Sequence, residues 1–203
     1  MPRLRPAQHL PPRSTRARVG LFGGSFDPPH QGHLHVAQTA LKRLGLDEVW
    51  WIVARGNPLK ESPADFEART AAVQILVRGQ GGMNVSDVEL HAHLTYTIDT
   101  VSLFKEHSPG ARFVWIMGAD SLLHFHHWKS WQTLARTLPI AVIARPGALH
   151  APSTSPFAKV FSDARTPENA APVLVDQNAP AWTYLTAPLH PASSTAIRRG
   201  RSG

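Results

Sequence analysis

The chain has 203 residues, of which 42% are hydrophobic and 17% charged, a balance typical of a soluble globular protein with one domain and its own core. It has no cysteine, which excludes disulfides and thiolate metal sites and fits a cytoplasmic protein. No apolar run approaches the roughly 20 residues that span a bilayer, so no membrane association is expected.

The formal net charge of +7 favours an anionic partner such as a nucleotide, a phosphate group or nucleic acid. Much of the excess lies at the two ends, because residues 1–18 carry five arginines and no acidic residue. The proline-rich start lacks the apolar segment of a signal peptide. We therefore interpret 1–17 as a flexible basic tail and 18–203 as a single domain. Since no nucleic-acid-binding motif accompanies the tail, no nucleic acid partner is expected.

The first predicted elements form a β-α-β unit. A short apolar strand covers residues 18–22, followed by a loop over 23–29 with two glycines and two prolines. Apolar residues then recur at helical spacing over 30–45. Residues 48–54, EVWWIVA, are continuously apolar, as in a parallel strand that is covered on both faces.

The alternation of strands and helices continues to the end of the chain. In order, the sequence predicts a helix over 65–79, a strand over 83–90, a helix over 95–107, a strand over 112–117, a loop over 118–121, a helical turn over 131–137, a strand within 138–147, and a last strand and helix at 181–187 and 193–200. Residues 148–180 are rich in alanine and proline without a clear period, and we expect them to be irregular. The alternation predicts an α/β fold, a Rossmann-like open parallel sheet with helices on both faces and a small C-terminal helical part.

Ligands of such sheets bind at the carboxyl ends of the strands. Polar clusters follow four of the predicted strands at that edge, at 23–35, 57–60, 118–128 and 145–147. The sequence therefore predicts a single site built from the loops at this edge.

The stretch GGSFDPPHQGHLH, residues 23–35, carries the most specific chemistry. It has neither the third glycine of a dinucleotide fingerprint nor the Gly-Lys-Ser/Thr end of a P-loop. His30 and His33 lie one turn apart at a helix start, where the free N–H groups and the helix dipole attract anions. They fit a cradle for a phosphoryl group. The alternatives are a two-imidazole metal site, for which Asp27 is the one nearby carboxylate, and a solvated surface pair.

The same stretch resembles the signature of the HxGH nucleotidyltransferase superfamily. Five further segments resemble bacterial nicotinate-mononucleotide adenylyltransferases and occur in the order typical of that family. They are NPLK at 57–60, TYTIDT at 95–100, GADSLLHFHHW at 118–128, IARPG at 143–147 and SSTAIR at 193–198. The resemblance covers the chain from about residue 18 to residue 199.

This resemblance implies transfer of AMP from ATP to nicotinate mononucleotide, which gives nicotinic acid adenine dinucleotide and pyrophosphate in NAD biosynthesis. The 5′-phosphate would attack the α-phosphorus of ATP in line, with no covalent enzyme intermediate. Mg²⁺ would accompany ATP. A rival reading is the same chemistry on nicotinamide mononucleotide, and a monomer and a homodimer are both left open.

The resemblance also implies roles for individual residues. His30, His33 and Arg198 would be catalytic. ATP contacts are implied for Gly23, Gly24, Ser25, Phe26, His30, His33, Gly118, Asp120, Ser194, Thr195 and Arg198. Mononucleotide contacts are implied for Lys60, Thr97, Trp128 and Arg145, with Trp128 stacked on the pyridine ring and Thr97 at the carboxylate.

Other readings of these residues stay open from the sequence alone. Ser194 could be an ordinary helix cap, Asp120 a turn residue, and Lys60 or Arg145 a solvated loop cation. We assign four other tryptophans to the core, namely Trp50, Trp51, Trp115 and Trp131. The histidines at 124, 126 and 127 lack a matching acidic cluster, and we interpret them as loop residues rather than metal ligands.

Overall fold

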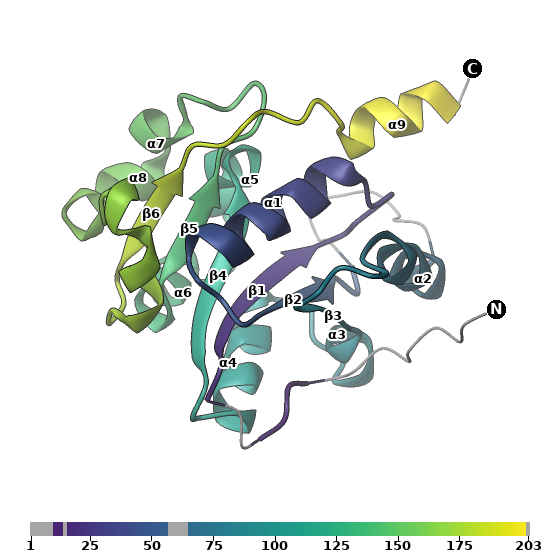
Figure 1. The fold of residues 1–203 in the computed structure, drawn as a ribbon, viewed down its shortest axis with the longest axis horizontal. Helices are drawn as coiled ribbons and strands as arrows, with labels where there is room; N and C mark the ends of the chain where they lie inside the picture. Colours follow the sequence, from purple (N-terminus) through teal and green to yellow (C-terminus); the bar gives the residue numbers. More distant parts are fainter. Residues whose placement is uncertain (1–9, 14–15, 57–64, 202–203) are drawn as a thin grey trace.

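In the computed structural model, which describes residues 10–13, 16–56 and 65–201, six parallel strands form one open sheet (Figure 1). The strands are β1 (Arg18–Gly24), β2 (Glu48–Val53), β3 (Met83–Ser86), β4 (Arg112–Gly118), β5 (Ile140–Ile143) and β6 (Trp182–Leu185). Their order is β3-β2-β1-β4-β5-β6. The order reverses between β1 and β4, and the crevice outside the carboxyl ends of strands at such a point is where open α/β sheets bind ligands.

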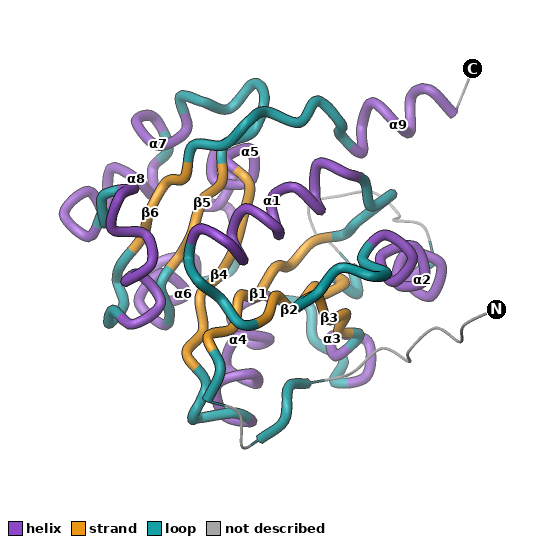
Figure 2. Tube along the Cα trace, viewed as in Figure 1, coloured by secondary structure: helices purple, strands orange, loops and turns teal. Residues whose placement is uncertain are grey.

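Helices cover both faces of the sheet, as Figures 1 and 2 show. One face carries α1 (Gln31–Arg43), α2 (Phe66–Leu76) and the 3-10 segment η3 (Glu168–Asp176). The other carries α3 (Val88–His91), α4 (Thr97–His107), α5 (Ala119–His124), the 3-10 segment η1 (Phe125–His127), α6 (Trp131–Thr137), α7 (Ala151–Thr154) and α8 (Pro156–Val160). A short 3-10 turn, η2 (Ser162–Ala164), and the last helix, α9 (Ser194–Arg201), complete the chain. The predicted Rossmann-like sheet is confirmed.

Each strand contributes alternate side chains to the two cores. Trp50 packs in the core beneath α4, whereas its neighbour Trp51 packs in the core beneath α1. Both are buried, as is Trp115 on β4, and Trp131 packs against the first of these cores. The core assignment of Trp50, Trp51 and Trp115 is therefore confirmed, whereas Trp131 is only partly buried. Burial on both faces explains why EVWWIVA reads as a continuous apolar run.

Three predicted boundaries are wrong. The first strand extends through Gly24, since Gly23 and Gly24 pair with Ile52 and Val53 of β2. The predicted strand over 83–90 ends at Ser86 and gives way to α3. Of residues 118–121, expected to be a loop, Gly118 ends β4 and the other three begin α5, where Asp120 in the first turn suits the positive end of the helix dipole.

The expectation of an irregular segment over 148–180 is also wrong. The segment forms α7, α8, η2 and η3, and it buries Phe157 and Leu174 in the two cores. Prolines start both α7 and α8 and a further proline interrupts η3, so each helical piece is short. Pieces of three to nine residues are too short to produce a detectable helical period.

Part of the predicted N-terminal tail lies against the domain. Leu10 packs on the core beneath α4, and Ser108 Oγ at the end of α4 donates to Pro12 O over 3.3 Å. In the described part of the chain, no helix is long and apolar enough to cross a membrane.

Candidate active site

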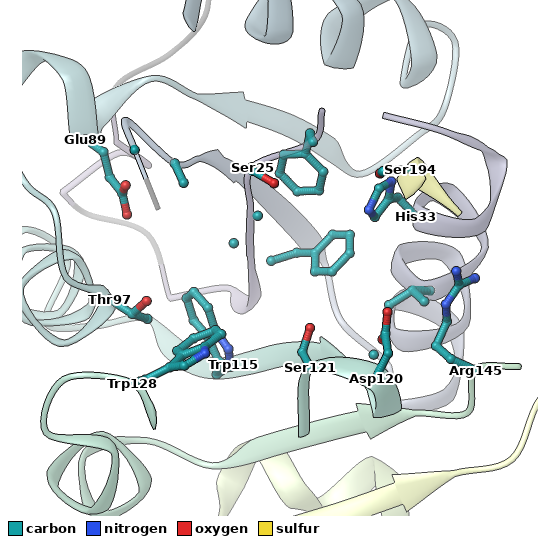
Figure 3. Close-up of a pocket in the computed structure, with 18 of the residues that line it drawn as sticks. Ser25, His33, Glu89, Thr97, Trp115, Asp120, Ser121, Trp128, Arg145 and Ser194 are labelled. Atoms are coloured by element: carbon teal, nitrogen blue, oxygen red, sulfur yellow. The ribbon is translucent and has the colours of Figure 1, made fainter. Parts of the chain in front are cut away.

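Loops at the carboxyl ends of the strands enclose a pocket of about 360 Å³. Every predicted site residue that the structure describes lines this pocket, and Lys60 falls in 57–64, outside the described residues. In Figure 3, Thr97 and Trp128 lie at one end of the pocket, and His33, Ser194, Asp120 and Arg145 lie at the other. We call these the ring end and the phosphate end, after the contacts that the sequence predicted for their residues.

His30 and His33 form one stacked unit at the start of α1. His30 is the N-cap residue, its N–H donates to His33 Nδ1 over 3.3 Å, and the two ring centroids are 3.8 Å apart. Burial lowers the pKa of His30 to about 4, helped by the positive charges of Arg145 and His190 and opposed by Asp120. His30 is therefore neutral near pH 7, and the first turn of α1 supplies N–H groups beside it.

Arg145 joins three elements at the phosphate end. Its side chain is buried, and its guanidinium donates to His190 O over 3.2 Å and to Ala192 O over 2.7 Å. These carbonyls belong to the segment that leads from β6 to α9. Gly32 of α1 lies against the same guanidinium, since a Cβ on Gly32 would be 2.5 Å from Arg145 Nη1. The start of α1, the loop after β5 and the approach to α9 thus meet at one cation.

The role of Gly32 was missed by sequence reasoning, although a signal was present. Glycine is an unfavourable residue inside a helix, so a glycine in the first turn of α1 calls for a packing reason. The close approach of Arg145 and Ala192 O supplies that reason.

The start of α9 returns to the loop that follows β1. Ser193 Oγ accepts from Ala196 N–H over 3.2 Å, so Ser193 caps the helix and Ser194 lies in its first turn. Ser194 Oγ donates to Pro28 O over 3.0 Å, and the Arg198 guanidinium donates to Asp27 O. These two contacts bring the hydroxyl, the guanidinium and the free N–H groups of α9 to the phosphate end.

The ring end combines a helix start with an aromatic side chain. Thr97 is the first residue of α4, which leaves the N–H groups of its first turn without helical partners. Trp128 is held edge-on by Phe125 and Trp115, with ring centroids 5.2 and 6.1 Å away. These edge contacts fix the plane of the indole at the wall of the pocket (Figure 3).

Two buried charged residues near the pocket were also missed. Glu89 lines the pocket, is 6% exposed, and accepts from Thr100 Oγ1 and from Arg55 N–H. Burial raises the pKa of the Glu89 carboxyl. Arg69 of α2 is 3% exposed and donates to the carbonyls of Ser25 and Ala54. No sequence signal could have paired them, since Glu89 lay within a predicted strand and Arg69 within an ordinary amphipathic helix.

The histidines at 124, 126 and 127, which we interpreted as loop residues, lie instead at the end of α5 and in η1. His126 and His127 have ring centroids 3.9 Å apart, and of the histidines at 124, 126 and 127 only His127 is among the described residues that line the pocket. Within the described ranges, no group of three or more His, Cys, Asp or Glu side chains could hold a metal ion.

Known proteins resemble this chain over most of its length. A family model described as cytidylyltransferase-like matches residues 21–200. A probable nicotinate-nucleotide adenylyltransferase of a Caulobacter species is 54% identical over 183 residues, which are 89% of this chain and 96% of that protein. The chain belongs to the nicotinate-nucleotide adenylyltransferase family. A probable member of this family from Mesorhizobium japonicum is 46% identical over 196 residues, 96% of this chain and 100% of that protein.

Solved structures with this family name share the fold. The Plasmodium falciparum nicotinic acid mononucleotide adenylyltransferase complexed with NaAD superposes with a TM-score of 0.68 at 19% identity. The match covers 90% of this chain and 82% of that chain. The complex of the same protein with APC gives a TM-score of 0.66, with 90% and 83% covered. The fold predicted from the alternation of strands and helices is thereby confirmed.

Proposed function

We propose that the protein transfers AMP from ATP to nicotinate mononucleotide and releases pyrophosphate. An oxygen of the mononucleotide 5′-phosphate forms a bond to the α-phosphorus of ATP, while the bond from that phosphorus to the oxygen of the departing pyrophosphate breaks. The observation that carries the proposal is one pocket with two chemically distinct ends, a cradle for phosphates and an aromatic wall beside a helix start. The names of the relatives that match nearly the whole chain support the same reaction.

At the phosphate end, the protein's task is to stabilise charge and align the reacting groups. His30 and His33 offer ring N–H groups, and the first turns of α1 and α9 offer backbone N–H groups. Arg198 and Arg145 add positive charge. Donors fixed in advance stabilise the charge that grows on the phosphoryl oxygens in the transition state. We assign His33 and Arg198 to the ATP phosphates, and Arg145 to the mononucleotide phosphate or to the support of α9.

The adenosine of ATP has backbone and ribose partners along the same wall. We assign the turn from Gly23 to Phe26 to close contact with the nucleotide, because the glycines leave room beside the main chain. Asp120, at the start of α5, is suited to accept hydrogen bonds from ribose hydroxyls, and Gly118 precedes it at the strand end.

At the ring end, Trp128 and Thr97 recognise the nicotinate group. The pyridine ring of the mononucleotide is positively charged, and an indole face attracts a cation. The carboxylate is an anion and suits the N-terminus of α4 and the Thr97 hydroxyl. An uncharged amide gains less from that helix end, so the acid is the preferred substrate.

The residues of the pocket fit Mg²⁺ that is carried by the phosphates of ATP. The described residues do not form a separate Mg²⁺ site made of protein ligands alone. The carboxylates that line the described pocket are Glu89 and Asp120, and Mg²⁺ is commonly held by substrate phosphates with only one or two carboxylates. When bound, the ion would neutralise phosphate charge. We further propose a cytoplasmic location for the cysteine-free chain.

The test is pyrophosphate release with ATP and Mg²⁺, with nicotinate mononucleotide and nicotinamide mononucleotide compared at equal concentration. We expect release with the acid to exceed release with the amide by at least about tenfold, the effect of one charge-assisted hydrogen bond. Equal rates would contradict the proposed recognition at Thr97 and leave the AMP transfer standing. Release with neither substrate would overturn the proposed function.

A further inference from the structure

The backbone N–H and C=O of Arg55, two residues beyond β2, each meet a buried charged side chain. Glu89 Oε2 accepts from Arg55 N–H over 3.1 Å, and Arg69 Nη2 lies 3.5 Å from Arg55 O. Glu89 and Arg69 are 6% and 3% exposed. This part of the chain leads directly into residues 57–64, which include the predicted substrate contact Lys60.

The same two side chains also reach two other segments near the pocket, α4 and the loop after β1. Glu89 Oε1 accepts from Thr100 Oγ1 over 2.8 Å, one turn after Thr97 in α4. Arg69 Nη1 donates to Ser25 O over 2.7 Å and to Ala54 O over 2.9 Å. Glu89 and Arg69 therefore connect the ends of β1 and β2 to the start of α4. Figure 3 shows Glu89 and Thr97 on the same side of the pocket.

Burial of a carboxylate costs free energy, since desolvation disfavours its charge and only well-placed hydrogen-bond or charge partners compensate. A buried charged side chain is therefore weak evidence for a role in stability alone. The two hydrogen bonds that Glu89 accepts instead fix a backbone N–H just beyond β2 and a hydroxyl on the helix that carries Thr97. Its partners thus point to a role in the geometry of the site.

We propose that Glu89 is a positioning residue for the mononucleotide: it fixes the start of α4 relative to the end of β2. The proposal rests on the proposed function, because the ring end is defined by the mononucleotide. Glu89 acts through Thr100 and Arg55, and the ATP phosphates meet other elements at the opposite end of the pocket. Loss of Glu89 should therefore affect one substrate and spare the other.

The test compares KM values for both substrates in wild type, Glu89→Ala and Glu89→Gln. We expect Glu89→Ala to raise the KM for nicotinate mononucleotide about tenfold or more, the effect of losing hydrogen bonds to a charged group, with the KM for ATP within about twofold. Glu89→Gln should restore most of the loss, because its carbonyl can accept from Arg55 N–H and its amide can donate to Thr100 Oγ1.

Glu168→Ala is the matched control. Glu168 accepts from Arg43, from Thr186 N–H and from Thr186 Oγ1, but it is not among the described residues that line the pocket. Its loss should lower the midpoint of thermal unfolding and leave both KM values unchanged. A general loss of stability is thereby separated from a loss of positioning.

Thr100→Val supplies a second, near-isosteric test that removes the hydroxyl alone. If Glu89 acts through Thr100, the effects of Glu89→Ala and Thr100→Val on the mononucleotide KM are not additive in the double variant. Additive effects, or equal shifts in the KM for ATP and for the mononucleotide, overturn the proposal. If Glu89→Ala does not fold, Thr100→Val decides it alone, and an unchanged mononucleotide KM in that variant overturns the proposal. If the wild-type protein releases no pyrophosphate, the proposed function is refuted. That result differs from a failure of the Glu89 proposal, which requires an active wild-type enzyme.

Discussion

Gly32 lies so close to Arg145 that a Cβ atom on Gly32 would be 2.5 Å from the guanidinium Nη1. A methyl group there would also come within 2.8 Å of Ala192 O, so it would push apart the contacts that hold the approach to α9. We expect Gly32→Ala to lower kcat/KM for ATP about tenfold or more and to destabilise the fold by about 1–3 kcal/mol.

Steady-state kinetics and urea unfolding check this prediction. Gly81→Ala is the control, because a Cβ on Gly81 meets nothing within 4 Å. Wild-type kcat/KM in Gly32→Ala would show that the close contact has no part in the arrangement of the phosphate end.

The stacked histidines predict a large loss of rate in His33→Ala. Removing a single donor to a developing oxyanion costs about 10²-fold or more in kcat. His35 lies on the same helix but is not among the described residues that line the pocket, so His35→Ala should keep kcat within about threefold. Similar losses in the two variants would contradict the role of His33, and the far-ultraviolet circular dichroism of both variants should match wild type.

The lowered pKa of His30 predicts a dependence of stability on pH. The unfolded chain protonates His30 near its ordinary value of 6.5, whereas the folded protein does so only near 4. Between these values the unfolded state binds more protons, so the free energy of unfolding falls as the pH decreases through this window. Protonation of His30 in the unfolded chain should lower the free energy of unfolding by about 2–3 kcal/mol at pH 4.5.

Urea unfolding of wild type and His30→Asn at pH 7 and pH 4.5 tests the effect. Asparagine does not titrate, so the variant should lose about 2–3 kcal/mol less than wild type over this interval. Identical pH dependence in the two proteins would mean that His30 titrates alike in the folded and unfolded states.

Trp128 should act on one substrate. We expect Trp128→Ala to raise the KM for nicotinate mononucleotide about tenfold, the usual effect of removing an aromatic stacking partner, with the KM for ATP nearly unchanged. Trp128→Phe retains a ring and should lie between wild type and the alanine variant. Equal changes in both KM values would refute the stacking role and assign Trp128 to the shape of the pocket.

Short-range patterns in the sequence determined much of this protein. The strands over 48–53 and 112–118 and the helix over 131–137 follow from local periodicity and lie within a few residues of their predicted positions. The meeting of the polar segments that follow strands was predictable for a related reason, because the carboxyl ends of parallel strands lie at one edge of the sheet. Each of these inferences needs only neighbours along the chain and the rules of one sheet. The roles of individual residues were instead implied by the resemblance to a family.

The tertiary structure alone decided the contacts between distant residues. Arg145 meets carbonyls 45 and 47 positions away, and Glu89 meets an N–H 34 positions away. Gly32 acquires its importance only where α1 and the approach to α9 pack against each other. The role of a buried charge or of a closely packed glycine cannot be read from neighbouring residues in the sequence. Its contribution to stability depends on partners that only the fold brings near. The short helices of 148–180 have the same origin, since packing of Phe157 and Leu174, rather than helical period, stabilises them.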